Sequence, residues 1–203
     1  MSEPQPLIFK FASEDWEFEA IHRLNYRTFV EEIPQHQRSP THRLVDKFHA
    51  ENTYLICRCG RQLVGMLAAR GNRPFSLDQK LPNLDSHLPP GRNLCEVRLL
   101  SVDKKYRGAR GGQVLSGLLA LLWQHAVERG YDFGIISGTT RQLKLYQHLG
   151  FVPFGPVVGT GATPVAITNT ALAAQVVHGS GAGQLQYQAT VFGDVFVGAT
   201  DAT

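Results

Sequence analysis

Charged side chains are scarce in the last quarter of this 203-residue sequence. Residues 155–203 contain no Lys, Arg or Glu, whereas residues 1–154 hold 35 of the 37 charged side chains. This break divides the chain into a domain at 1–155 and an uncharged tail at 156–203. Several interpretations of the tail stay open: it completes the sheet of the domain, it is a poorly ordered extension, it is a strand-exchanging element of a homodimer, or it reflects a shifted reading frame.

Cysteine is scarce as well, and its pattern excludes a disulfide framework. The three cysteines, Cys57, Cys59 and Cys95, are an odd number in a long chain. Cys57 and Cys59 supply only half of a metal site, because no second pair has ligand spacing. We therefore interpret them as buried strand thiols, predict no metal, and expect a reducing compartment, the cytoplasm.

Long hydrophobic runs are missing too. The longest mostly apolar stretch, 114–123, is shorter than the roughly 20 residues of a membrane-spanning helix. The N-terminus lacks the basic and then apolar segments of a secretory signal. The formal net charge of +3 is too small to indicate a nucleic-acid partner. The sequence thus predicts neither a membrane span nor nucleic-acid binding.

The N-terminal part predicts a strand followed by an amphipathic helix. The strand is expected at 6–11, and the helix begins after its cap, Ser13, and ends at Pro34. At 100° per residue one arc of the helix is apolar, and Asn25 projects from the middle of that arc. The apolar members of the arc are Phe18, Ile21, Phe29 and Ile33.

A hairpin and a long insertion follow. Residues 52–59 and 62–69 are predicted strands joined at Gly60. Residues 70–93 contain four prolines and predict an ordered loop with one helical turn near 77–81. Residues 94–102 then form a further strand.

A basic, glycine-rich turn lies between that strand and a helix predicted from the apolar stripe at 114–126. Glycines let the backbone approach an anion, and the helix N-terminus adds the positive end of its dipole. The turn lacks the Gly-Lys-Ser/Thr of a P-loop and the glycine spacing of a dinucleotide site. It predicts a pyrophosphate site, with a solvated turn as the alternative; its basic residues are Lys104, Lys105, Arg107 and Arg110.

A second motif follows a strand predicted at 131–137 and lies at the end of a helix predicted at 140–149. It reads Leu-Tyr146-Gln-His-Leu-Gly150-Phe151. Gly150 stops the helix and Phe151 opens the next strand. A tyrosine phenol is protonated at neutral pH, so Tyr146 suits the protonation of a leaving thiolate. A core aromatic is the alternative.

These two motifs resemble those of the GNAT acyltransferase superfamily, over residues 5–155. Arg107 and Gly112 match the ends of its cofactor motif, Arg/Gln-x-x-Gly-x-Gly/Ala, while Arg110 replaces the first glycine. Residues 145–151 match its Leu-Tyr-x-x-x-Gly-Phe signature. The resemblance implies an α/β GNAT fold: a mixed, mostly antiparallel sheet, splayed between its fourth and fifth strands and flanked by helices.

The resemblance also implies the co-substrate, which is acetyl-CoA or a longer acyl-CoA, or an acyl carrier protein. The pantetheine arm would lie in the splay and pair with the strand backbone, and the turn would hold the pyrophosphate. The implied cofactor-binding residues are Leu100, Ser101 and Val102 of the strand, and Arg107, Gly108, Ala109, Arg110, Gly111 and Gly112 of the turn.

Glu96 is the candidate general base, because an amine nucleophile must lose a proton. It lies where several GNAT enzymes carry their base. A two-residue repeat places Glu96, Arg98, Leu100 and Val102 on one face of the strand. Arg98 then keeps Glu96 ionised. An Arg–Glu pair that only organises the cleft is the alternative.

Other residues resemble a narrower GNAT-like branch, the autoinducer synthases and the long-chain N-acyl amino acid synthases. Asn25 replaces an arginine and His49 an aspartate of that branch, which argues against a homoserine-lactone product. The resemblance implies an amino-acid-like acceptor and an acyl chain longer than acetyl, with the 70–93 insertion walling the acyl pocket. The implied substrate-binding residues are Asn25, Phe29, Asp46 and Arg98.

The predicted function is N-acyl transfer from acyl-CoA to the amine of a small molecule, with Glu96 as base and Tyr146 as acid. A long-chain N-acyl amino acid synthase is the narrower alternative, and a non-catalytic acyl-CoA sensor would need neither residue. The last strand of the sheet is expected at 164–167 or at 185–191. Apolar and polar residues alternate better in 185–191, which is followed by an expected turn at 192–195.

Overall fold

The computed structural model describes residues 5–88, 90–108, 110–138 and 142–154, and the backbone of the later strand segments 158–159, 166–169, 174–177 and 184–191. The chain forms two compact units, residues 1–70 with 98–125 and residues 71–97 with 126–203. The domain boundary expected near residue 155 stays a prediction, because residues 155–157 and much of the tail lie outside the described residues.

The first unit contains neighbouring strands in the order β1 (Leu7–Phe11), β2 (Thr53–Cys59), β3 (Gln62–Arg70) and the second half of β4 (Leu94–Val102). The predicted hairpin is confirmed: β2 and β3 are antiparallel from Thr53–Ala69 to Cys59–Gln62. Gly60 turns the chain with a φ of 59°, which glycine adopts without a steric penalty.

Helix α1 (Asp15–Tyr26) continues directly into a π-helix, η1 (Arg27–Glu32). The expected cap at Ser13 is wrong by one residue. Glu14 is the N-cap, and it forms a capping box with Glu17, which also accepts a hydrogen bond from the backbone N–H of Ser13 at 2.9 Å. The helical segment ends just before Pro34, as predicted.

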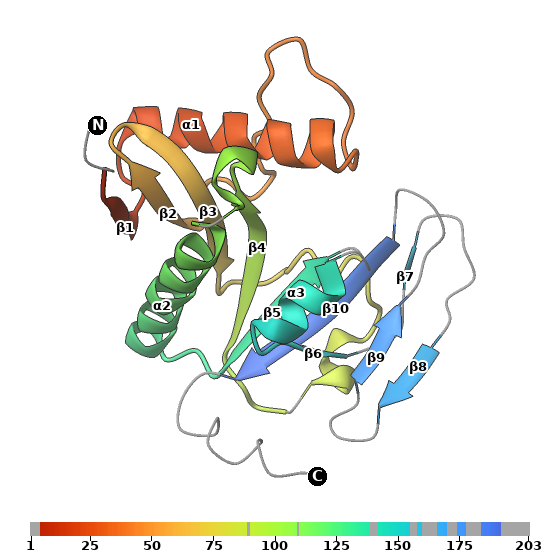
Figure 1. Ribbon diagram of the computed structural model, residues 1–203. Helices are drawn as coiled ribbons and strands as arrows, with labels where there is room; N and C mark the ends of the chain where they lie inside the picture. Colours follow the sequence, from red (N-terminus) through yellow and green to blue (C-terminus); the bar gives the residue numbers. More distant parts are fainter. Residues whose placement is uncertain are drawn as a thin grey trace. The chain divides into compact units, whose positions relative to one another are not determined.

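Helices α1 and α2 (Gly111–Arg129) cover opposite faces of the strands in this unit (Figure 1). Ile21 and Leu24 of α1 form an apolar cluster with Tyr54, Ile56 and Met66. Gly65 faces the other way, since a Cβ at that position would lie 2.5 Å from Val114 of α2. The alternation of β3 thus supplies one apolar surface to each helix.

Strand β4 departs from the simple two-residue repeat at Leu99, which has a φ of 55°. A left-handed residue interrupts the alternation, so the single face predicted for Glu96, Arg98, Leu100 and Val102 does not continue through it. Leu99 packs against the α1 cluster. Non-glycine residues in this conformation are strained and gather at functional sites.

The second unit contains the 71–93 insertion, which has an apolar core of its own. The predicted helical turn is confirmed by the hydrogen bond from Leu81 N–H to the Leu77 carbonyl at 2.8 Å. A short 3₁₀ helix, η2 (Leu84–His87), follows. The buried cluster comprises Phe75, Leu77, Leu81, Leu84, Leu88, Ile135 and Phe154.

Strands of the second unit surround β5 (Phe133–Gly138). The first half of β4 is parallel to β5, from Leu94–Phe133 to Val97–Ile136. On its other side β5 pairs antiparallel with β10 (Gln184–Val191), which also pairs with β6 (Val152–Pro153) and β7 (Val158–Gly159). The mixed sheet with flanking helices confirms the predicted fold class.

The better alternating segment of the tail, 185–191, is the one that joins the main sheet, as β10. The other candidate, 164–167, contributes Ala166 and Ile167 to β8 (Ala166–Asn169), which pairs with β9 (Ala174–Val177). Residues 164–165 and the turn expected at 192–195 lie outside the described residues. Within the part of the chain that is described, no helix has the length and hydropathy needed to cross a membrane.

Candidate functional site

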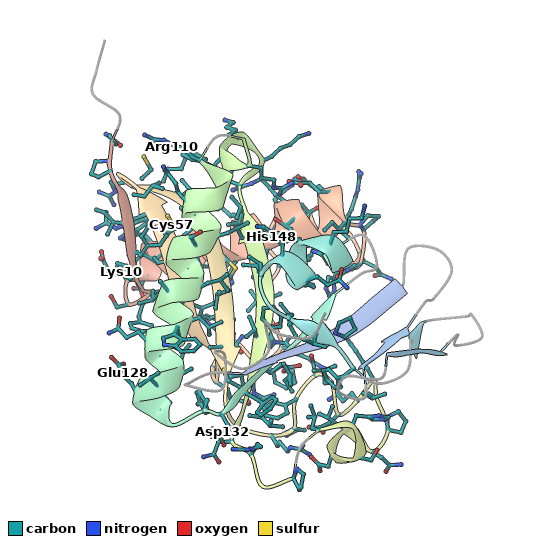
Figure 2. The ribbon with its side chains drawn as sticks, turned by 60° about the horizontal axis from the view of Figure 1, so that its bottom comes forward. Lys10, Cys57, Arg110, Glu128, Asp132 and His148 are labelled. Atoms are coloured by element: carbon teal, nitrogen blue, oxygen red, sulfur yellow. The ribbon has the colours of Figure 1, made fainter. Side chains whose placement is uncertain are left out.

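The glycine-rich turn begins where β4 ends. Asp103 caps a short 3₁₀ turn, η3 (Lys104–Tyr106), by accepting a hydrogen bond from the Lys105 N–H at 3.0 Å. Helix α2 starts five residues after η3, with Arg110 at its N-terminal end (Figure 2). The chain therefore runs from a strand through a basic turn into a helix N-terminus, as predicted.

Gly108 and Gly112 leave open space beside this helix N-terminus. A Cβ at either position would meet no atom within 4 Å, and neither has a positive φ. Protein packing and turn geometry therefore do not require glycine here. An anion that approaches the backbone closely would require it. Ala109 of the predicted turn lies outside the described residues.

Arg107 is held by its own neighbours. Its guanidinium forms an ion pair with Glu32, at the end of the π-helix, and its Nε donates to the Val102 carbonyl at 2.7 Å. Arg110 lies 3.5 Å from the Gln5 carbonyl. The Arg107 contacts orient a cation at the entrance to the turn, and they also tie the end of β4 to η1.

A second polar group in the first unit surrounds Asp46. Arg98 donates to one oxygen of the Asp46 carboxylate at 2.6 Å, and both side chains are nearly buried. The backbone N–H of Phe48 and the amide of Asn52 donate to the other oxygen, at 2.8 and 3.1 Å. The structure thus brings together two of the predicted substrate-binding residues, Asp46 and Arg98.

Electrostatics favour the ionised form of Asp46. Burial by itself would raise its pKa, but the charge of Arg98 and the three hydrogen bonds outweigh burial and hold the pKa below its ordinary value. Asp46 is therefore a carboxylate at neutral pH, and Arg98 is its counter-ion.

An aromatic ring supports this ion pair. The guanidinium carbon of Arg98 lies 4.8 Å from the centre of the Phe48 ring, and that of Arg70 lies 3.8 Å from the same centre. Arg70 in turn pairs with Glu51. Two arginines therefore contact one aromatic ring.

The remaining predicted substrate residues, Asn25 and Phe29, are buried on the helical segment. Both amide atoms of Asn25 lack a hydrogen-bond partner in the described part of the protein, as do the hydroxyls of Thr28 and Ser101. The π-helix begins between Asn25 and Thr28. Buried polar groups without partners and π-helical turns are both features of functional sites.

Glu96, in the second unit, is fully buried and tied to the insertion. Its carboxylate accepts the hydroxyl of Ser76, the backbone N–H of Ser76 at 3.0 Å and the backbone N–H of Leu77 at 3.2 Å. These contacts give Glu96 a structural role that the sequence did not reveal. The spacing of residues along the strand did not predict the contact with Ser76, which lies 20 residues earlier in the chain.

Tyr146 belongs to a helix-stop motif at the end of α3 (Leu143–His148). The N–H of Phe151 donates to the Tyr146 carbonyl at 2.9 Å, the N–H of Gly150 donates to the Gln147 carbonyl at 3.0 Å, and Gly150 has a φ of 85°. This is the Schellman arrangement, which normally includes an apolar contact between the first and last of these residues. The Tyr146 and Phe151 rings, 6.1 Å apart, supply that contact.

The Tyr146 side chain is buried, and a Cβ at Gly138 would lie 2.3 Å from its ring. Burial raises the pKa of the Tyr146 phenol well above its ordinary value. The phenol is thus protonated across the neutral range, which is the form that a general acid needs.

The cysteines are free, and burial raises the pKa of the Cys57 thiol to about 12. Across the described residues, no three His, Cys, Asp or Glu side chains gather in a way that would hold a metal ion.

Residues 20–165 match the family model of the N-acyl amino acid synthase FeeM. The chain belongs to this family. It is therefore an N-acyltransferase, which decides between the enzyme and the non-catalytic sensor weighed from the sequence. A search of the curated proteins finds no significant match.

Solved structures with the same fold include FeeM from uncultured soil microbes, with 16% identity, a TM-score of 0.58, and coverage of 92% of this chain and 91% of that one. A CoA-dependent acyl-homoserine lactone synthase, BjaI, has 20% identity, a TM-score of 0.65, and coverage of 94% and 85%. A GNAT-family acetyltransferase from Staphylococcus aureus has 12% identity, a TM-score of 0.54, and coverage of 93% and 100%. These likenesses confirm the GNAT fold.

Proposed function

We propose that this member of the FeeM family transfers an acyl group from acyl-CoA to the amine of an amino-acid-like small molecule, in the cytoplasm. The open glycine turn at the N-terminus of α2 carries the proposal. Gly108 and Gly112 face space that no protein atom fills, beside a helix dipole and basic side chains. A pyrophosphate matches the charge of this turn.

The fold neighbours support CoA as the donor. BjaI is described as a CoA-dependent synthase, and the basic turn after β4 suits the pyrophosphate that CoA carries. The backbone of Leu100, Ser101 and Val102 would pair with the pantetheine arm. An acyl carrier protein is the alternative donor. Its phosphopantetheine would present one phosphate to the turn, whereas CoA presents two.

For the acceptor, Arg98 is the residue that would recognise a carboxylate. A guanidinium binds a carboxylate through two parallel hydrogen bonds. Asp46 and Phe48 orient Arg98 for this contact. An amino acid should therefore be a better acceptor than the corresponding amino acid amide, and Arg98→Lys should reduce that preference, because an ammonium cannot make the paired contact.

The chemistry needs one proton removed and one supplied. The acceptor nitrogen attacks the thioester carbonyl, the C–S bond breaks as the amide forms, and the proton lost by nitrogen passes to Glu96, directly or through a water. Tyr146 gives its proton to the departing thiolate of CoA. Tyr146 is in the protonated form that this step requires, because burial raises the pKa of its phenol.

Gly112 provides the test of the phosphate site. Gly112→Asp places a carboxylate in the open space, and Gly112→Asn places a neutral side chain of the same shape there. Both variants should fold, because a Cβ at Gly112 meets nothing within 4 Å and an acidic residue suits a helix N-terminus. We expect Gly112→Asp to weaken CoA binding at least about tenfold more than Gly112→Asn, measured by calorimetry.

Arg107→Ala with Arg110→Ala should also weaken CoA binding, and the matched control is Arg38→Ala with Arg129→Ala, which removes two exposed arginines far along the chain. A Gly112→Asp protein that binds CoA as tightly as the parent would remove the phosphate assignment.

A further inference from the structure

Tyr54 connects the buried carboxylate of Asp46 to a histidine of the first unit. The amide nitrogen of Asn52 donates one hydrogen bond to Asp46 at 3.1 Å and a second to the Tyr54 hydroxyl at 3.2 Å. The Tyr54 hydroxyl in turn lies 3.1 Å from Nδ1 of His49. Together with the ion pair between Asp46 and Arg98, these contacts form one polar network that runs from Arg98 to His49.

The direction of each hydrogen bond in this network follows from its carboxylate. Asp46 is ionised and can only accept, so the Asn52 amide presents its nitrogen to Asp46 and to Tyr54. Burial raises the pKa of the Tyr54 phenol to about 12, so Tyr54 keeps its proton. The Tyr54 oxygen already accepts from Asn52. Its proton therefore goes to Nδ1 of His49, the acceptor that the described part of the protein offers it.

His49 is thus held as the neutral tautomer that carries its proton on Nε2. A proton on Nδ1 would face the hydroxyl proton of Tyr54 across the 3.1 Å contact. The half-buried His49 ring also packs against the His22 ring, whose centre lies 4.8 Å away. Burial, and then the neighbouring His49, lower the pKa of His22, so His22 is neutral at pH 7. The network therefore ends on a pair of neutral imidazoles.

We propose that His49 is a positioning residue for the acceptor: by accepting from Tyr54, it fixes the polar network that orients the Arg98 guanidinium toward the acceptor carboxylate. Without this acceptor the buried Tyr54 hydroxyl must turn to find another, which breaks its bond with Asn52. Asn52 then holds Asp46 less firmly, and Asp46 holds Arg98 less firmly. This inference rests on the proposed function, in which Arg98 binds the carboxylate of an amino-acid-like acceptor.

Steady-state kinetics test the role of His49, with octanoyl-CoA as donor and each proteinogenic amino acid and its amide as acceptors. For the best acceptor, kcat/KM for the acid relative to the amide should fall about fivefold in His49→Leu and in Tyr54→Phe. The fall should appear in KM for the acid, with kcat unchanged. The double variant should lose no more than either single variant, because both interrupt the same network.

Two further variants serve as controls. His49→Asn places an amide oxygen close to the position of Nδ1, where it can accept from Tyr54, so this variant should keep the parental ratio. His148→Leu removes an exposed imidazole from α3 and should keep the ratio as well (Figure 2).

Nuclear magnetic resonance of the imidazole nitrogens tests the tautomer without any substrate. At pH 7.5 the His49 signals, assigned by their loss in His49→Asn, should show a proton on Nε2 and none on Nδ1. A proton on Nδ1 would overturn the inference.

The kinetic outcomes separate this inference from the proposed function. A parental ratio in His49→Leu, a reduced ratio in His49→Asn, or a loss of about 25-fold in the double variant overturns the inference while the proposed function stands. A parent protein that acylates acids and amides equally well overturns the role of Arg98 and this inference with it. A parent that acylates none of these amines overturns the proposed function as well.

Discussion

Asp46→Asn replaces the carboxylate oxygen that faces Arg98 with an amide nitrogen. The other oxygen, which accepts from Phe48 and Asn52, is kept. The substitution therefore places the amide N–H donor of Asn opposite the N–H donor of Arg98, which form a 2.6 Å contact in the parent. It also removes the negative charge that neutralises Arg98. The Asp46 and Arg98 side chains are only 7% and 11% exposed, so water replaces little of the lost contact.

The magnitude follows from this burial. Removing one partner of a buried ion pair costs about 3–5 kcal/mol, and the small exposure of this pair places the expected loss of unfolding free energy at about 3 kcal/mol. For a chain of this length that loss corresponds to roughly 6–12 °C in Tm. The control is Glu19→Gln. The Glu19 side chain is 36% exposed and pairs with Arg23 and Arg43, which are 59% and 42% exposed, so each pair should contribute about 0–1 kcal/mol.

The pH dependence gives a second readout. The folded-state pKa of Asp46 lies below its ordinary value, so its contribution is fully present above the unfolded value near 4 and is lost as pH falls through the folded value. Urea unfolding should therefore show a constant difference between parent and variant from about pH 5 to 7, and a shrinking one below about pH 4. An Asp46→Asn protein no less stable than Glu19→Gln would refute the reasoning.

Further predictions concern catalysis. Tyr146→Phe keeps the ring contact with Phe151, so it should retain CoA affinity and lose roughly 10²-fold in turnover; parental turnover would mean that the thiolate leaves without this acid. Glu96→Gln should lower turnover, with partial recovery at high pH. Ser76→Ala removes only one hydrogen-bond donor to Glu96 and should not reproduce that pH profile. The same profile in both variants would mean that Glu96 acts only by holding the insertion in place. Gly138→Ala should displace the Tyr146 ring and cost about 1–3 kcal/mol of stability, and an unchanged denaturation midpoint would contradict the packing. Octanoyl-CoA or a longer thioester should raise Tm more than acetyl-CoA does, and the opposite order would rule out a long acyl pocket.

Local patterns in the sequence were enough to predict the elements and the two motifs. Gly60 turns a hairpin and Gly150 ends a helix because each adopts a positive φ, which is a property of the residue itself. The glycine turn before α2 is likewise a contiguous segment, so its order of strand, turn and helix could be predicted without a structure. The alternation at 185–191 predicted a strand for the same reason.

Only the tertiary structure decided which side chains meet. The sequence spacing pointed to Glu96 as the partner of Arg98 and did not indicate the ion pair that Arg98 forms with Asp46, 52 residues earlier. Glu96 in turn accepts hydrogen bonds from Ser76 and Leu77 of the insertion. The left-handed Leu99 interrupts the two-residue repeat after Arg98, so Leu100 and Val102 do not continue the face expected for Glu96 and Arg98. A carboxylate accepts hydrogen bonds from whichever donors folding brings within about 3 Å. When the donor and the carboxylate lie on different segments of the chain, their spacing in the sequence does not predict that distance.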